Sequence, residues 1–354
     1  MEVFACQACG QVLYFENVLC ERCGHALGYL PDLSTISAVE PQDGHWTALA
    51  ADSAPYRYCK NYEAGVCNWM LPVESAETFC AACRHNKTIP DLSVPENLEL
   101  WRKLEAAKRR LIYSLLKLGL PLQNQTDNPE RGLAFEFLSE AQAPHGQSVM
   151  TGHDNGVITL ALVEADDAKR EHARAQMGEP YRTLLGHFRH EIGHYYWNIL
   201  VRDGGKLETF RTVFGLEDQD YAAALQSHYA NGPPVDWRQN FVTAYASAHP
   251  WEDFAETWAH YLHIVDTLET ARSFGVKVRT RASRETKKEA AVDFDPHKSP
   301  SIERLIGAWL PLCFAVNSLN RSMGQADLYP FVLAPTAIAK LGYVHELMRD
   351  RRQN

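Results

Sequence analysis

The sequence predicts an α+β fold in which small cysteine-rich modules, each stabilised by a metal ion, precede a larger domain of helices and strands. Three observations predict it. Eight of the nine cysteines lie before residue 90. After Pro95 the apolar residues recur every three to four positions, which indicates an amphipathic helix. The β-branched run at 157–163 follows a Gly-His-Asp-Asn-Gly turn cluster and is short enough to be a strand.

Length and charge exclude several classes of function. A chain of 354 residues with 45% hydrophobic residues can bury a sizeable core. Its net charge of -9 gives no general attraction to phosphate backbones or anionic lipids, so neither nucleic acid nor a membrane is an expected partner. The N-terminus lacks the basic start and apolar run of a secretory signal, and no segment approaches the roughly 18 apolar residues of a membrane span. We therefore expect a cytoplasmic protein; the oligomeric state has no signature in the sequence.

The first four cysteines form two Cys-x-x-Cys pairs separated by a hairpin-length spacer, which is the pattern of a zinc ribbon. They are Cys6, Cys9, Cys20 and Cys23. Residues 1–30 are too few for a hydrophobic core, so a bound metal must supply the stability. Because four thiolates close a zinc site and leave no position for water, the role of this site is structural or in recognition, not catalytic.

A second group of cysteines is predicted to close another zinc site in residues 56–90. Its members are Cys59, Cys67, Cys80 and Cys83, of which only the last two have Cys-x-x-Cys spacing. Residues 31–55 are rich in Pro, Asp, Ser and Ala without periodicity, so we expect a linker between the two modules. Cys313 lies in an apolar run and is interpreted as a core thiol.

The larger domain is predicted to span residues 91–354. The helix after Pro95 carries basic residues that we interpret as a solvated face in preference to a binding patch: Arg102, Lys103, Lys108, Arg109 and Arg110. A charged segment from 277 to 300 lacks apolar periodicity and is expected to be an exposed loop. Helical spacing returns after Ile302.

The sequence His-Glu-Ile-Gly-His at 190–194 carries the clearest chemical signal. It lies within a segment of helical apolar spacing from Pro180 to about residue 200. On a helix His190 and His194 share a face and can hold one ion, while Glu191 reaches a water bound to that ion. Zinc lowers the pKa of such a water and polarises a carbonyl, and the carboxylate moves the proton. The alternative is a pair of surface histidines beside a helical glutamate.

A zinc ion held by two histidines needs a third protein ligand and an open fourth position. In a helix predicted to begin at Pro250, the residues Glu252, Glu256 and His260 are four apart and share one face. Pro250 at the first helical position places Glu252 in the first turn, where the helix dipole favours an ionised carboxylate. We predict Glu252 as the third ligand and Glu256 as the residue that orients a ligand. The alternative is that Glu252 only caps its own helix.

These motifs together resemble the gluzincin peptidases, in particular the branch that includes anthrax lethal factor and the proline-specific clostridial endopeptidases. The resemblance rests on the His-Glu-Ile-Gly-His sequence and on the later Glu-Asp-Phe-Ala-Glu at 252–256. It implies a zincin-like catalytic domain with Glu252 as third zinc ligand. It also implies that Tyr245, seven residues earlier, stabilises the transition state. Other candidates for this donor are Tyr261, His260 and Tyr329.

The whole chain, cysteines included, also resembles a family of bacterial zinc-ribbon metallopeptidases whose substrates are undefined. The gap between the histidine pair and Glu252 is longer than in the lethal-factor branch and leaves room for an extra loop. The strand at 157–163 precedes the catalytic helix, where zincins pair a strand with an extended peptide, although an ordinary core strand is an equal alternative.

We therefore expect a zinc metallopeptidase that acts on protein or peptide, with about three zinc ions, one catalytic and two structural. Two other functions stay open. One is a zinc-ribbon adaptor or binding protein whose zincin-like domain lacks catalysis. The other is a zinc amidohydrolase that acts on a non-peptide amide.

Overall fold

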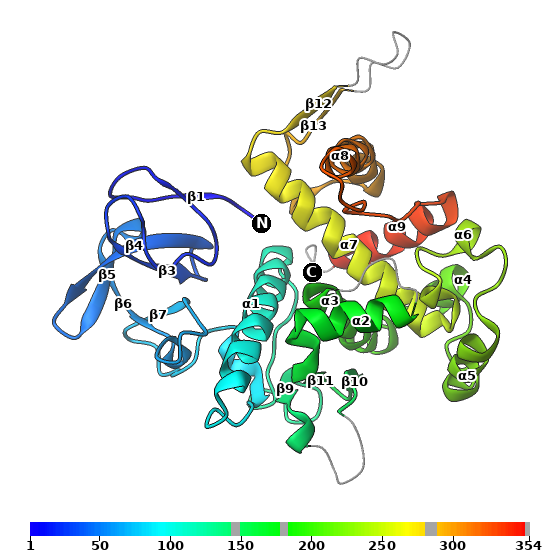
Figure 1. Cartoon of the computed structure of the whole chain (residues 1–354), viewed down its shortest axis with the longest axis horizontal. Helices are drawn as coiled ribbons and strands as arrows, with labels where there is room; N and C mark the ends of the chain where they lie inside the picture. The colour runs from blue at the N-terminus through cyan, green and yellow to red at the C-terminus, as the bar shows by residue number, and fades with distance from the viewer. Residues whose placement is uncertain (143–148, 178–182, 280–288, 351–354) are drawn as a thin grey trace. The chain divides into compact units, whose positions relative to one another are not determined.

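The computed structural model describes residues 1–142, 149–177, 183–279 and 289–350. Helices account for 48% and strands for 16%, in agreement with the predicted mixed fold. The chain divides into two compact units, Met1–Glu171 and His172–Asn354, each with its own internal packing (Figure 1).

The N-terminal unit contains a five-stranded antiparallel sheet in which consecutive strands are neighbours. Its strands are β3 (Ala26–Leu30), β4 (Thr35–Gln42), β5 (His45–Ala48), β6 (Ala54–Tyr58) and β7 (Met70–Pro72). A bridge between Tyr29 and Trp69 brings the first strand beside the last, so the sheet closes on itself. The enclosed side chains form an apolar cluster: Leu30, Val39, Ala48, Tyr56 and Met70. Gly28 lies beside them, and a Cβ atom there would lie 2.1 Å from the sulfur of Met70, so a larger residue would displace the Met70 side chain.

The linker predicted for residues 31–55 is wrong, because this segment forms β4, β5 and a short helical turn, η1 (Leu49–Ala51). In β4 the residues from Ile36 to Val39 are all buried, since both faces of the strand are covered. Such a strand lacks the alternation of polar and apolar residues by which strands are recognised in a sequence.

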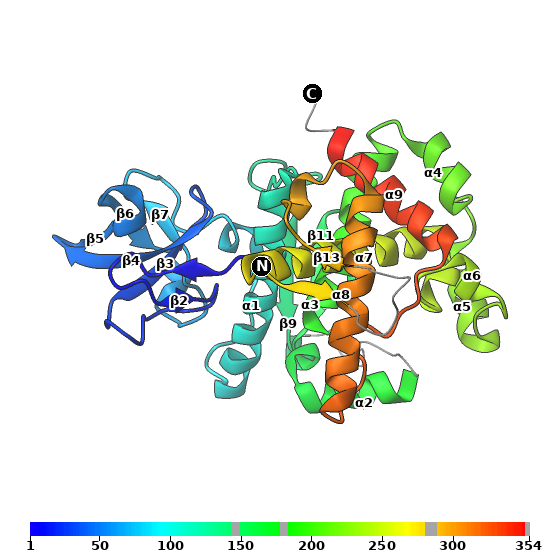
Figure 2. The same ribbon diagram turned by 90° about the horizontal axis from the view of Figure 1, so that it is seen from above.

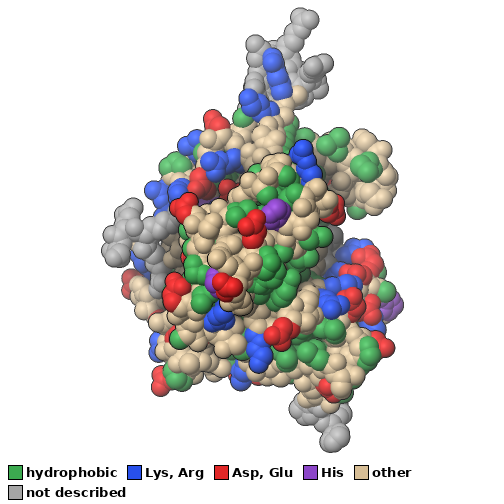
Figure 3. All heavy atoms as spheres, turned by 90° about the vertical axis from the view of Figure 1, so that its left-hand side faces the viewer, with side chains coloured by type: hydrophobic (Ala, Val, Ile, Leu, Met, Phe, Trp, Pro, Cys, Tyr) green, Lys and Arg blue, Asp and Glu red, His purple; other side chains and the backbone are tan. Residues whose placement is uncertain are grey.

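The start of the chain forms a small hairpin, β1 (Phe4–Ala5) with β2 (Val12–Leu13). An aromatic cluster of Phe15, Tyr29, Trp69 and Tyr113 joins it to the closed sheet and to helix α1 (Pro95–Leu118), with ring centroids 4.8–6.1 Å apart. On the face of this unit drawn in Figure 3, the described acidic and basic side chains are interspersed with apolar ones and form no continuous basic area.

Helix α1 is confirmed at its predicted start, but its basic face is not solvated throughout. Lys108 and Arg109 are buried. Lys108 Nζ donates to Glu105 Oε1 at 2.8 Å and also to Asn86, and Arg109 donates to the carbonyl of Val66. The interpretation as a solvated face was wrong for these two residues. A lysine or arginine side chain can be buried when its N–H groups donate to acceptors in the protein.

A second sheet in the same unit has the strand order β10-β11-β9-β8. Its strands are β8 (Asn86–Thr88), β9 (Ala134–Leu138), β10 (Gly152–Asp154) and β11 (Val157–Ala161). The strand predicted at 157–163 is therefore confirmed as β11, although it ends two residues early. It pairs with β9 on one side and with β10 on the other, so it has no free edge for a substrate peptide over its first three residues. The edge strand on that side is β10, which favours the alternative that β11 is an ordinary core strand.

The remaining elements among the described residues of this unit are four short 3-10 turns and one helix, α2, which contains the last residues of this unit and the first of the next. They are η2 (Lys60–Tyr62), η3 (Cys83–His85), η4 (Glu140–Gln142), η5 (Leu162–Ala165) and α2 (Asp167–Met177).

The second unit is built around α7 (Pro250–Ser273), on which α3, α4, α8 and α9 pack (Figure 2). Its other elements are α3 (Leu184–Tyr196), a π-helical turn η6 (Trp197–Arg202), α4 (Leu207–Phe214), α5 (Tyr221–Asn231), α6 (Trp237–Asn240), η7 (Tyr245–Ser247), α8 (Ile302–Ser322) and α9 (Pro335–Asp350). The helices predicted around the histidine pair and after Pro250 are thus confirmed, while Pro180 itself lies outside the described residues.

The segment from 277 to 300 is not simply an exposed loop. It contains a strand pair, β12 (Lys277–Arg279) with β13 (Glu289–Ala291), and the turn η8 (Pro296–Lys298), where His297 is buried. Residues 280–288 of the predicted loop lie outside the described residues.

Helix α8 holds the ninth cysteine and is unusually apolar. Cys313 is buried, as predicted, and burial raises the pKa of its thiol to about 11. By length and composition α8 could cross a membrane, contrary to the expectation that no segment approaches such a span, but 44% of its most apolar window is buried inside the protein.

Candidate active site

The predicted catalytic helix α3 and helix α7 lie in close contact. Thr183 caps α3 by accepting from the backbone N–H of Gly186 at 3.0 Å, and His249 caps α7 by accepting from that of Trp251 at 3.1 Å. Gly193 faces Ala255, where a Cβ atom on the glycine would lie 3.0 Å from the Ala255 Cα. A larger residue at this position would therefore force the two helices apart by a few tenths of an ångström.

This approach brings His190, His194 and Glu252 together. The Nε2 atoms of the two histidines are 3.1 Å apart. Glu252 Oε2 lies 3.0 Å from His190 Nε2, and its Oε1 lies 3.5 Å from His194 Nε2. Zinc bonds of about 2.0–2.2 Å to nitrogen and oxygen place tetrahedral ligand atoms about 3.4 Å apart. The three residues therefore fit a zinc ion in both donor type and spacing, and their role as ligands stays a prediction.

Glu256 lies behind the histidine pair. Its Oε1 accepts from His190 Nδ1 at 2.7 Å, and its Oε2 accepts from Thr243 Oγ1 at 2.7 Å. A proton on Nδ1 leaves the lone pair on Nε2, the atom that faces His194 and Glu252. The predicted orienting role of Glu256 thus has the required geometry.

The electrostatics of the cluster favour an ionised carboxylate. Burial raises the pKa of Glu252, but His194 and His190 beside it lower it by more, so that it lies well below its ordinary value. Burial likewise lowers the pKa of His190, whereas hydrogen bonds to Glu252 and Glu256 raise it well above the usual range. Metal ligation requires a deprotonated carboxylate, which this arrangement provides, and a neutral imidazole, so an ion that binds here replaces the second proton that His190 otherwise holds.

Tyr245 and Glu191 flank the cluster. The ring of Tyr245, in η7, has its centroid 5.9 Å from that of His190. Burial, and next the charge of Glu252, raise the pKa of its hydroxyl, so it carries its proton at neutral pH. Glu191 is half-buried on α3, one position after His190.

The other candidate donors make hydrogen bonds among themselves or with helix α9. His260 Nδ1 is 2.6 Å from Tyr329 Oη, and Tyr261 Oη is 2.8 Å from His345 Nδ1 in α9. Tyr245 remains the candidate with a contact to a predicted ligand.

Sequence reasoning missed Tyr221. Its hydroxyl donates to Glu252 Oε1 at 2.6 Å from helix α5, which begins where Asp220 accepts from the N–H of Ala223. Helix α5 lies in the long gap between the histidine pair and Glu252, for which the motifs gave no positions. Trp251 was also missed; its ring centroid lies 3.8 Å from that of His194. The sequence indicated its contact with the site only through its position immediately before Glu252.

The structure also brings the cysteines together in their two predicted groups of four. In the first group the Cys6 and Cys23 sulfurs, and the Cys9 and Cys20 sulfurs, are 3.6 Å apart. In the second group the sulfurs of Cys67 and Cys80 are 3.7 Å apart, and Cys59 Sγ accepts from the N–H of Cys80 at 3.4 Å. Zinc–sulfur bonds of about 2.3 Å place tetrahedral sulfurs about 3.8 Å apart. None of the cysteines, all within the described residues, forms a disulfide.

Comparisons with known proteins find matches for both the cysteine-rich segment and the rest of the chain. Residues 97–347 match the family described as "Putative zinc-binding metallo-peptidase", and residues 3–94 match a zinc-ribbon domain. Uncharacterized proteins of Mycobacterium bovis and Mycobacterium tuberculosis are 42% identical over 353 residues, which is 99% of this chain and 96% of each relative. No solved structure matches.

Proposed function

Since the chain belongs to this family of zinc-binding metallopeptidases, we propose that it hydrolyses peptide bonds in protein or peptide substrates, with Glu191 as general base and a gluzincin-like ligand set. The observation that carries the proposal is the cluster of His190, His194 and Glu252, whose ligand atoms lie 3.0–3.5 Å apart. Glu191 follows His190 on the same helix and is the candidate for proton transfer.

A zinc ion held by this cluster lowers the pKa of water and polarises a carbonyl oxygen. Glu191 takes a proton from the attacking water and gives it to the amine nitrogen as the C–N bond breaks. Tyr245, still protonated, donates to the carbonyl oxygen as negative charge develops on it. Glu256 and Tyr221 hold His190 and Glu252 in place through the hydrogen bonds described above.

The cysteine clusters support two further zinc ions with structural roles and a cytoplasmic location. A reducing compartment keeps such thiols available for metal, whereas an oxidising one favours disulfides. Elemental analysis of the purified protein tests the ion count, and fractionation of the producing cells tests the location.

Digestion of an unbiased peptide library tests the function. Wild-type protein should produce fragments that a chelator abolishes, while Glu191→Gln should retain its zinc and lose most of its turnover. Glu208→Gln, an exposed carboxylate on α4, is the matched control and should cleave at the wild-type rate. A zinc-loaded wild-type protein that cleaves no peptide would contradict the proposal and leave the adaptor function. Cleavage of small non-peptide amides without cleavage of peptides would support the alternative function of a zinc amidohydrolase.

A further inference from the structure

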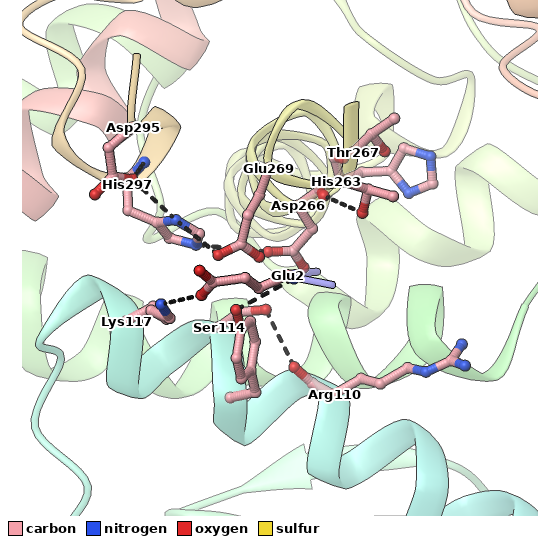
Figure 4. Close-up of polar contacts among 12 residues, drawn as sticks. Glu2, Arg110, Ser114, Lys117, His263, Asp266, Thr267, Glu269, Asp295 and His297 are labelled. Carbon is pink, nitrogen blue, oxygen red and sulfur yellow. Dashed lines mark hydrogen bonds and ion pairs between the residues drawn. The ribbon is translucent and has the colours of Figure 1, made fainter. Parts of the chain in front are cut away.

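A second group of metal-binding residue types lies on α7, apart from the catalytic residues. Asp266, Glu269 and His297 each present one ligand atom, and these atoms lie within 4.8 Å of one another. All three side chains are buried. Figure 4 shows the two carboxylates of α7 turned toward the imidazole of His297 in η8. Asp266 follows Glu252 by 14 residues, which is about 21 Å of helix, so the group is separate from the candidate active site.

The imidazole of His297 faces the two carboxylates of α7 through different ring nitrogens. His297 Nε2 faces Asp266 Oδ1 at 3.8 Å, and His297 Nδ1 faces Glu269 Oε1 at 3.6 Å. Both distances exceed the roughly 2.7–3.2 Å of N–H···O hydrogen bonds. Only one ring nitrogen can bind a given ion. With Nε2 as the ligand, its 3.8 Å distance from Asp266 Oδ1 fits two atoms bound at about 2.0–2.2 Å, which are about 3.4 Å apart in a tetrahedral site and farther apart at wider angles. Glu269 completes the group, since one ligand atom of each residue lies within 4.8 Å of the others.

Neighbouring residues orient these ligands. Arg189 pairs with Asp266 Oδ2, so the other oxygen, Oδ1, is the one that faces His297. Asp295 Oδ1 accepts from the backbone N–H of His297 at 3.0 Å and lies 3.5 Å from its Nδ1. A carboxylate behind one ring nitrogen directs the other nitrogen toward an ion, the same relation that Glu256 has to His190.

We propose that Asp266, Glu269 and His297 bind a divalent transition-metal ion, with zinc as the first candidate, at a structural site separate from the catalytic one. Imidazole and carboxylate are ligands that zinc accepts together. The ion would fasten η8 to α7 by joining residues that are 28 positions apart in the chain. Such a link favours the folded state, because the site does not exist in the unfolded chain.

The competing occupant of this group is a proton. Burial lowers the pKa of His297, but Asp266 and Asp295 beside it raise it by more, to about 9. Without an ion the ring is therefore an imidazolium that attracts the same carboxylates.

Counting zinc in purified variants separates the two occupants. His297→Asn should contain one zinc ion per chain fewer than the wild type. His345→Asn, which removes another buried histidine on α9, should keep the wild-type count. His190→Ala should lose a different ion, so the double variant with His297→Asn should lose two. A folded His297→Asn protein with the wild-type count would overturn the proposal, whatever the fate of the catalytic ion.

A second measurement applies if His297→Asn does not fold. The His190→Ala protein, rinsed with chelator, is titrated with Co²⁺ and followed by absorption. One equivalent should bind with d–d bands and no thiolate-to-cobalt charge transfer, because the ligands are nitrogen and oxygen. No binding, or bands of thiolate character alone, would overturn the proposal.

Discussion

Replacing Tyr221 with phenylalanine should weaken zinc binding at the candidate active site by about 10–100-fold, the usual loss for a residue that orients a ligand. The hydroxyl of Tyr221 donates to Glu252 Oε1 at 2.6 Å, and Glu252 is only 1% exposed, so water cannot readily replace the donor. A hydrogen bond to a charged group contributes about 1.5–3 kcal/mol. Since about 1.4 kcal/mol changes a Kd tenfold, loss of this hydrogen bond alone also predicts a Kd that is about 10–100-fold weaker.

Competition with a chromophoric chelator measures this change in the zinc Kd. Tyr229→Phe is the matched control, because Tyr229 lies on the same helix and is 71% exposed. Its Kd should equal that of the wild type. A folded Tyr221→Phe protein that binds zinc as tightly as the wild type would refute the idea that α5 supports the ligand.

The remaining predictions concern the other roles at the site and the pH dependence of stability. Tyr245→Phe should bind zinc and peptide normally but lower kcat by about 10²-fold, as measured by steady-state kinetics; an unchanged kcat would exclude it as the oxyanion donor. Glu256→Gln should cost about 10–100-fold in zinc affinity or activity, and a zinc titration with peptide cleavage checks both. His190→Ala should lose the catalytic zinc, which elemental analysis detects as one ion fewer. Burial lowers the pKa of His260 from 6.5 to about 4, so the unfolded chain takes up a proton at this residue between these pH values while the folded protein does not. The free energy of unfolding should therefore fall as the pH is lowered through this window, by up to about 1.4 kcal/mol per pKa unit. In urea titrations His260→Gln should show a smaller fall.

Prediction from the sequence succeeded where the signal was local. Helices α1 and α7 begin at Pro95 and Pro250, both positions that the sequence marks by a proline. It failed at β4, whose buried residues do not alternate, and at Lys108, whose burial depends on a carboxylate three residues earlier and on Asn86 from another segment. These features depend on what covers a residue, and no short pattern records that.

The sequence by itself identified the candidate metal-binding residues of this protein, because many of them are close in the chain. Cys-x-x-Cys pairs and histidines four apart on a helix face converge through local backbone geometry alone. The tertiary structure decided what completes each site. Glu252 reaches the histidines where Gly193 lets α3 lie close to Ala255, and Tyr221 reaches Glu252 from a helix in the gap between the motifs. These contacts join residues far apart in the chain, so they follow from the packing of whole helices and not from spacing in the sequence.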